Sequence, residues 1–120
     1  MSSEHPRLVE LGRKWIAAWN TRDLEHVLTL YAEDAEMTSD HVVRLGFSVQ
    51  GSLRGKHNLR AYWSKALAAG NADLHFTEIA VYTSPNSLVV HYENQRGQKI
   101  CEYLRVDRDG RIVQGSANHV

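Results

Sequence analysis

The apolar pattern of this chain changes near Gly70, and that change restricts the fold more than any other feature of the sequence. Before Gly70, apolar residues recur three and four positions apart, which is the spacing of one face of an α-helix. After it, short runs rich in β-branched and aromatic residues alternate with turn residues, as in antiparallel strands. Helices followed by strands predict an α+β domain.

Three helices are expected in the first part of the chain. The first spans residues 6–20 and begins with a proline, which the first turn of a helix accepts. Asp23 can cap a second helix whose apolar stripe spans residues 24–31, and residues 55–70 predict a third helix bounded by glycines. Residues 40–54 contain glycines and scattered apolar side chains, so we expect a loop or an irregular strand there.

Strands are expected in one short segment, residues 35–39, and in four runs after the third helix. These runs span residues 74–82, 88–94, 98–106 and 111–118. The connections between the runs contain the glycine, proline, asparagine and aspartate that hairpin turns need. The predicted fold is one α+β domain over residues 1–120, with three helices packed in the concave face of a curved, mixed or antiparallel sheet.

Charge and cysteine content exclude several classes of protein. Lysine and arginine balance aspartate and glutamate at 14 each, so we expect neither nucleic acid nor a membrane surface as a partner. Cys101 is the single cysteine, which excludes an internal disulfide and fits a reducing compartment. The first residues lack the pattern of a signal peptide, and no segment approaches the ~20 apolar residues of a membrane span. We therefore expect a cytoplasmic protein.

The predicted helices carry more large aromatic side chains than the packing of so small a domain requires. Trp15, Trp19, Tyr31 and Trp63 all fall on the apolar stripes. They are expected to line a concavity that binds a small apolar or aromatic molecule. A core filled by the same side chains is the alternative.

Glu102 is the best candidate in the chain for a group that carries a proton. Strand alternation places it on the same face as Ile100, Leu104 and Val106, which should point inward. Burial disfavours a charged carboxylate and raises its pKa, unless a cation or several donors compensate. The alternative is a glutamate that reaches solvent or pairs for structural reasons with a basic side chain such as Arg111.

The order of several motifs resembles the SnoaL-like branch of the nuclear transport factor 2-like superfamily. The motifs are WxxAWNxxDLExxLxLYAEDAE at residues 15–36, LRGKxxLRxYW at residues 53–63 and DxDGRI at residues 107–112. The resemblance implies a cone, in which a strongly curved sheet wraps around helices and encloses an apolar pocket, and a homodimer formed through the outer sheet face. The superfamily includes ketosteroid isomerases, polyketide cyclases, limonene epoxide hydrolases and dehydratases, so the fold does not define the function.

The resemblance places Glu102 where ketosteroid isomerases have a protonated aspartic acid that donates to an oxyanion. Two other residues of that active site differ, because its general-base aspartate falls at Ser39 and its oxyanion tyrosine at Trp15. Asp40 could replace the base only if a bulge turned it inward, since a shift of one residue points a strand side chain to the opposite face. We expect Asp40 to face solvent.

The same resemblance places His119 at an inward position of the last strand, where the small residues Gly115 and Ala117 leave room. The expected pocket is apolar and has two titratable groups, Glu102 and His119. The expected ligand-binding residues are Trp15, Trp19, Tyr31, Ser39, Trp63, Leu104 and Ala117. A penultimate residue such as His119 that frays from the strand is the alternative.

The sequence contains no recognisable spacing of metal or cofactor ligands. Its seven histidines include no HxH or HExxH pair, and no glycine-rich phosphate loop is present. Arg105 and Asp107 are expected at an exposed turn, where they could not form the buried Asp-Arg-Asp arrangement of the epoxide hydrolases. We expect neither a metal nor a cofactor.

Three functions are compatible with these features. The first is a homodimeric cone that binds an apolar or aromatic molecule, with Glu102 and His119 hydrogen-bonding its polar end. The second is an isomerase, cyclase or dehydratase in which Glu102 acts as acid or base with Asp40 or His119 as its partner. The third is a dimerisation module with a vestigial pocket.

Overall fold

The structure is a computed structural model that describes residues 5–68 and 72–119. Four helices and six strands occur along these residues. The helices are α1 (Pro6–Thr21), α2 (Leu24–Leu28), α3 (Asp40–Arg44) and α4 (Lys56–Ala68). The strands are β1 (Tyr31–Thr38), β2 (Ser52–Arg54), β3 (Thr77–Ser84), β4 (Ser87–Glu93), β5 (Lys99–Val106) and β6 (Ile112–His119). The α+β class expected from the sequence is confirmed.

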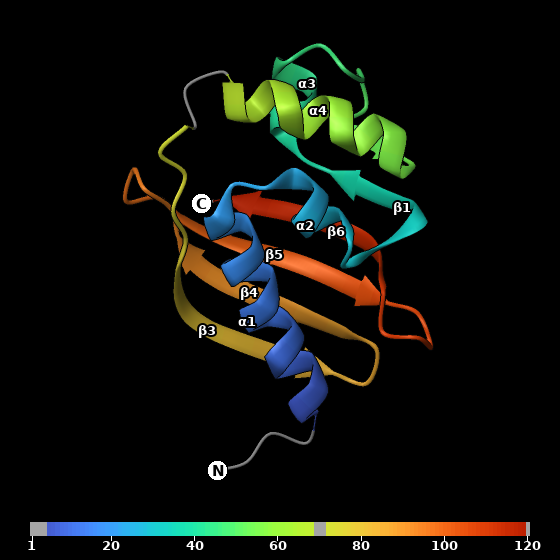
Figure 1. The fold of residues 1–120 in the computed structure, drawn as a ribbon, viewed down its shortest axis with the longest axis vertical. Helices are drawn as coiled ribbons and strands as arrows, with labels where there is room; N and C mark the ends of the chain where they lie inside the picture. The colour runs from blue at the N-terminus through green and yellow to red at the C-terminus, as the bar shows by residue number, and fades with distance from the viewer. Residues whose placement is uncertain (1–4, 69–71, 120) are drawn as a thin grey trace.

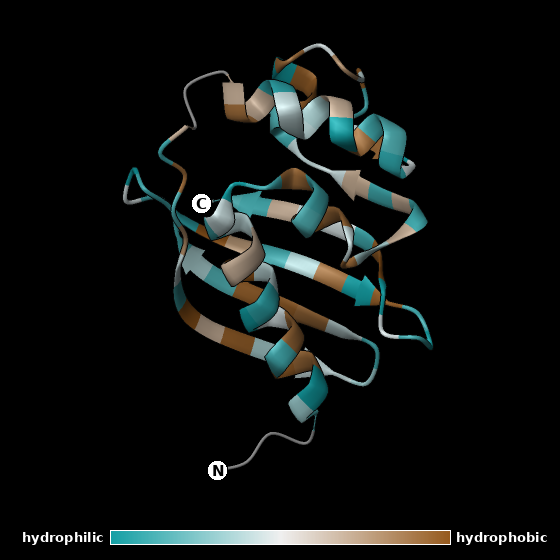
Figure 2. Cartoon of the chain, viewed as in Figure 1, coloured by the Kyte–Doolittle hydropathy of each residue, from teal (hydrophilic) through white to brown (hydrophobic). Residues whose placement is uncertain are grey.

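The six strands form one mixed sheet in the order β2-β1-β6-β5-β4-β3. Strands β1 and β6 run parallel, and every other neighbouring pair is antiparallel. Figure 1 shows α1 lying across β3 and β4, while α4 lies beside β1 at the other end of the sheet. Hydrophobic and hydrophilic residues alternate along β3 to β5 (Figure 2), as expected for strands with one buried face.

Helix α1 packs tightly against the sheet at Gly12. A Cβ atom at this position would lie 3.0 Å from a methyl carbon of Val81 on β3 and 3.2 Å from one of Leu88 on β4. One and two turns further along the helix, the side chains are the large buried rings of Trp15 and Trp19. The contact of α1 therefore changes from a glycine to large aromatic rings toward its C-terminus.

Hydrogen bonds tie the C-terminal end of α1 to the segment that precedes β3. The Asn20 amide donates to the Phe76 carbonyl oxygen at 2.9 Å and accepts from the Phe76 backbone N–H at 2.7 Å. Arg22 donates to the carbonyl oxygen of Leu74 at 2.9 Å. Phe76 and Leu74 are therefore held beside the aromatic end of α1.

Two sequence-based boundaries were wrong. Tyr31 was expected to end the second helix, but α2 ends at Leu28 and Tyr31 is the first residue of β1, paired with Ile112 of β6. Residues 40–54, expected as a loop or irregular strand, contain the short helix α3 and the three-residue strand β2. Ser39 starts α3 because its side-chain oxygen accepts from the His41 backbone N–H at 3.2 Å, which caps the helix.

The remaining elements agree with expectation to within a few residues. The predicted helix 55–70 corresponds to α4, which follows Gly55 with its φ of +91°, and the expected stop at Gly70 lies outside the described residues. The predicted strand 74–82 corresponds to β3, which begins three residues later because Leu74 and Phe76 are hydrogen-bonded to the side chains of Arg22 and Asn20 instead. None of the helices in the described ranges combines the length and hydropathy that crossing a membrane requires.

Candidate functional site

A cavity of about 400 Å³ lies between α1, α4 and the inner face of the sheet. Its volume falls within the range of ~300–1,000 Å³ that is typical of small-molecule sites. Aromatic residues make up much of its wall: Trp15, Trp19, Tyr31, Tyr62, Trp63, Phe76 and Tyr92. The same rings belong to the buried core, so the cavity adjoins packed side chains.

The aromatic rings pack against one another, and several of the contacts are edge to face. The Trp63 ring contacts Trp19 at a centroid distance of 5.1 Å and Tyr31 at 5.2 Å, with interplanar angles of 85° and 63°. Trp15 contacts Tyr92 at 5.4 Å, so these contacts extend from α4 across α1 to the sheet. Such pairs are each worth about 0.5–1.5 kcal/mol beyond their buried area. These contacts therefore stabilise the arrangement of the wall.

Glu102 lies on the inner face of β5, where strand alternation placed it. Only 4% of the residue is exposed, and it faces Val90 on β4 and Ala117 on β6 in the register of the sheet. Gly115 is also close, because a Cβ atom there would lie 3.7 Å from a carboxyl oxygen of Glu102. The small neighbours on β6 leave the carboxyl group in contact with the cavity.

Burial raises the pKa of the Glu102 carboxyl to about 8, and a hydrogen bond with Tyr92 opposes only part of that increase. No lysine, arginine or histidine among the described residues forms an ion pair with Glu102, and the alternative partner Arg111 is exposed. At neutral pH the carboxyl group is therefore mainly protonated. If the Tyr92 hydroxyl donates to one carboxyl oxygen, the O–H on the other can donate into the cavity.

Two phenols accompany this carboxyl group. Burial, followed by the nearby Glu102 charge, raises the pKa values of both Tyr31 and Tyr92 above the ordinary range. The Tyr31 hydroxyl oxygen accepts from the Trp15 indole N–H at 3.0 Å. Both tyrosines are thus neutral at physiological pH, and the buried part of the cavity carries no permanent charge.

Trp19 contributes a polar group that lacks a partner. Its indole N–H is buried, and no described residue accepts a hydrogen bond from it. A buried donor left unpaired costs about 1–3 kcal/mol, so such groups are uncommon in folded proteins. Other atoms of Trp19 line the cavity, while its N–H is buried among the surrounding side chains.

Most of the residues predicted for the site surround the same cavity. They are Trp15, Trp19, Tyr31, Ser39, Trp63, Glu102, Ala117 and His119. Leu104 is fully buried on the same face of β5, but it does not line the cavity. Asp40 is exposed at the first position of α3 and also does not line it, so the structure brings His119, but not Asp40, to the space that Glu102 faces.

The conformation of Ser39-Asp40-His41 is determined by the start of helix α3. Ser39 is 5% exposed, donates its backbone N–H to Gly51 and is hydrogen-bonded through its side chain to Tyr62. As α3 begins, Asp40 points to solvent while His41 lines the cavity.

Several cavity residues were not identified from the sequence. Tyr92 could have been found, because it alternates with the buried Leu88 and Val90 on β4. His41 and Arg44 could not, since their position depends on α3, a helix of only five residues. Within residues 5–68 and 72–119, no three His, Cys, Asp or Glu side chains are close enough together to hold a metal ion.

The raised pKa of Glu102 makes the stability of the protein depend on pH. Between its ordinary pKa of 4.5 and about 8, the folded protein holds a proton that the unfolded chain has released, so the free energy of unfolding falls as pH rises. We expect Glu102→Gln, a neutral substitution, to remove this decline, which for one proton is at most about 1.4 kcal/mol per pH unit. Urea unfolding at several pH values between 5 and 8 measures the difference.

Glu93→Gln is the matched control, because Glu93 lies on the opposite face of the neighbouring strand β4. It should leave the slope of the wild-type curve unchanged. Parallel wild-type and Glu102→Gln curves over this pH range would show that the carboxyl group of Glu102 is ionised in the folded protein.

The comparisons with known proteins agree with this architecture. A SnoaL-like protein of unknown function from Burkholderia thailandensis is 36% identical, with a TM-score of 0.86 and 92% of each chain covered. An NTF2-like protein of unknown function from Burkholderia pseudomallei is 21% identical, with a TM-score of 0.76, over 100% of this chain and 92% of that one. TerC, solved after co-crystallization with polyporic acid, is 15% identical, with a TM-score of 0.75, over 93% of this chain and 90% of that one.

The NTF2-like protein and TerC are less than 25% identical to this chain, so their similarity shows the fold alone. None of the curated proteins matches the chain. The model of the SnoaL-like domain matches residues 12–115, which include the aromatic end of α1, all of β4 and β5 and the first half of β6. The chain therefore belongs to the SnoaL-like domain family.

Proposed function

We propose that this protein binds a small apolar or aromatic molecule inside the cone, with the protonated carboxyl group of Glu102 donating a hydrogen bond to its polar end. The observation that carries the proposal is a buried carboxyl group in an aromatic cavity, with one phenol and no cation as its partner. A structural glutamate would be expected to have a basic partner or access to solvent. Glu102 has neither among the described residues.

The polar groups of the cavity restrict the kind of ligand. The Glu102 O–H is a donor, and the carboxyl group carries no charge for most molecules at neutral pH. A ligand oxygen that accepts a hydrogen bond, such as a carbonyl or ether oxygen, satisfies such a donor. An ammonium group would lose its hydration in the aromatic cavity.

A proton-transfer enzyme of the isomerase, cyclase or dehydratase type is the second candidate. It is favoured by the position of Glu102 and His119 on the wall of one cavity, and by a pKa of Glu102 close enough to neutrality for proton exchange at physiological pH. In this function Glu102 protonates or deprotonates the bound molecule, and His119 accepts or supplies the second proton. Asp40 is not part of it, because its side chain is exposed outside the cavity.

A homodimer through the outer sheet face is proposed as the assembly. The helices cover the other face, and the outer face carries Tyr82, which is 56% exposed and stacks on His91. In the register of the sheet, Tyr82 is aligned with Val89 on β4 and Tyr103 on β5. A row of apolar and aromatic side chains across several strands is suited to packing against a second copy. A dimerisation module with an unused pocket would share this feature.

The binding proposal predicts that neutral aromatic ketones or ethers raise the melting temperature of the protein, because a ligand that binds the folded state stabilises it. Ala117→Phe places a ring in the cavity opposite Glu102 and should abolish the shift while the protein stays folded. Differential scanning fluorimetry of both proteins against a compound panel measures the effect. No shift with any compound, or equal shifts in the two proteins, would refute the proposal and favour a module with an unused pocket.

The enzyme proposal predicts that a stabilising compound with an acidic C–H bond exchanges that hydrogen for deuterium when it is incubated with the protein in deuterated buffer. Proton NMR of the compound measures the rate. Glu102→Gln should reduce the exchange by about 10²–10⁴-fold, the usual contribution of a general acid or base, while thermal shifts with the same compound show that it still binds. Exchange at the rate of the buffer alone, or equally fast with Glu102→Gln, would exclude this role of Glu102.

The assembly proposal predicts a dimer in analytical ultracentrifugation and a monomer for Tyr82→Glu, which places a charge in the interface. Val49→Glu is the matched control, because Val49 is 93% exposed in the connection between α3 and β2, away from the sheet face. It should leave the dimer intact. A monomeric wild-type protein would contradict the proposal.

A further inference from the structure

The charged residues that line the cavity are unevenly distributed. Glu102 is the one acidic residue among the described residues of the lining, and it is buried. The basic residues of the lining are His41, Arg44, Arg96 and His119, which are exposed or half-exposed and which we call the basic rim. In the whole chain lysine and arginine balance aspartate and glutamate at 14 each, so an excess of arginine over carboxylates at the rim does not follow from the composition.

The basic rim is assembled from distant parts of the chain. His41 and Arg44 lie on α3, Arg96 lies in the connection between β4 and β5, and His119 is the last residue of β6. Burial lowers the pKa of His41, and the charges of Arg44, Arg96 and His119 lower it further. Coulomb interactions weaken with distance and are screened in water, so these groups lie near one another in space as well as around one opening.

Placing like charges together is unfavourable unless an anion compensates. No carboxylate of a described residue forms an ion pair with Arg44. Three other surface arginines, Arg13, Arg54 and Arg60, each pair with a glutamate. Arg44 differs from these three, and it adds positive charge to the wall of the aromatic cavity.

We propose that the ligand is an amphiphilic organic anion, whose apolar body occupies the aromatic cavity and whose carboxylate, sulfonate or phosphate group binds Arg44 and Arg96 at the basic rim. This inference rests on the proposed binding function and names its ligand class. Guanidinium groups bind such oxyanions in bidentate geometry, which favours arginine over other cations in this role.

The charge distribution also determines the orientation of the ligand. An anionic group placed deep in the cavity would lose its hydration next to a carboxyl group that is itself destabilised when charged. At the basic rim the same group keeps part of its water and gains cationic partners. The neutral oxygen of the ligand therefore points to Glu102 and its anionic group points outward.

A pair of fluorescent probes with the same ring system separates charge recognition from apolar binding. Anilinonaphthalene sulfonate carries an anionic group, and phenylnaphthylamine is its uncharged counterpart. We expect the double variant Arg44→Gln/Arg96→Gln to weaken binding of the sulfonate about tenfold, as expected for the loss of two partly exposed charge pairs. Binding of phenylnaphthylamine should change by less than about twofold, because its contacts are apolar.

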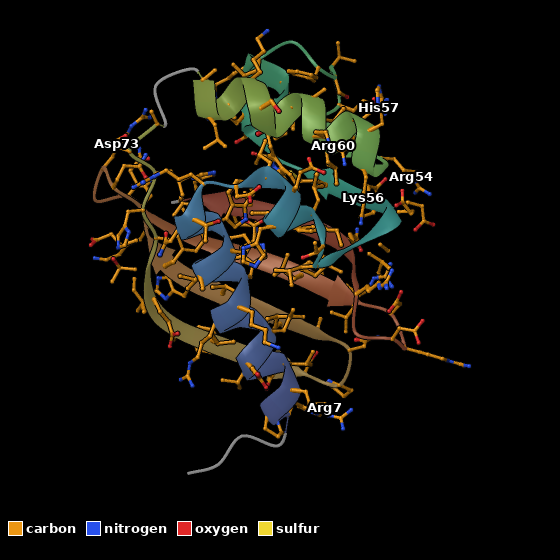
Figure 3. All side chains as sticks on the ribbon, viewed as in Figure 1. Arg7, Arg54, Lys56, His57, Arg60 and Asp73 are labelled. Atoms are coloured by element: carbon orange, nitrogen blue, oxygen red, sulfur yellow. The ribbon has the colours of Figure 1, made fainter. Side chains whose placement is uncertain are left out.

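Two control variants test whether weaker binding of the sulfonate is due to the lost charges of the basic rim. Arg7→Gln removes an exposed arginine near the N-terminal end of α1, at the opposite end of the molecule from α4 (Figure 3), and should change binding of neither probe. Arg44→Lys/Arg96→Lys keeps the charges and should restore most of the affinity for the sulfonate. Circular dichroism of each variant verifies that the fold is retained.

The possible outcomes separate this inference from the binding function on which it rests. If the double glutamine variant weakens both probes equally, or neither, the basic rim does not recognise an anion and the inference is overturned. If neither probe binds the wild-type protein, or Ala117→Phe leaves binding of both unchanged, the cavity is not the binding site and the proposed function fails first.

Discussion

The contacts between aromatic rings of the helices and the inner face of the sheet are the interaction on which the rest of the structure depends. Trp15 stacks on Phe76 at 5.7 Å, and Phe76 contacts Tyr92 at 4.3 Å, so α1 rests on rings instead of on the backbone of the sheet. Trp63 extends the same network to α4 through its contact with Trp19. Rigid rings at these positions keep the two helices apart from the sheet and leave the cavity between them.

The properties of Glu102 follow from that arrangement. A carboxyl group at the same position in a sheet with a solvent-exposed face would remain ionised, because water would stabilise its charge. Here burial among the surrounding side chains removes most of the water from the carboxyl group, and the nearby polar groups include neutral phenols and an indole. The two arginines among the described residues of the lining, Arg44 and Arg96, are exposed. The cavity therefore has apolar walls, hydrogen-bond donors inside and cations at the basic rim. This arrangement suits a molecule with one neutral end and one anionic end.

The sequence was sufficient to predict the features that depend on periodicity, and insufficient for those that depend on short local hydrogen bonds. Alternation correctly placed Glu102 on the inner face of β5, and helical spacing correctly placed Trp15, Trp19 and Trp63 on buried stripes. Tyr31 continued the helical spacing of α2, yet the chain leaves that helix at Leu28 because the following residues pair with β6.

The helix α3 was missed because one serine cap and five residues produce no periodic signal. Because α3 was not predicted, the sequence did not indicate that His41 and Arg44 line the cavity, and the basic rim was not recognised.

The most direct test of a protonated Glu102 in the aromatic cavity is its ionisation, measured from the pH dependence of its carboxyl carbon NMR signal, with Glu102→Gln used to assign it. We predict a midpoint near pH 8. A midpoint near 4.5, the ordinary value for a solvated glutamate, would contradict it.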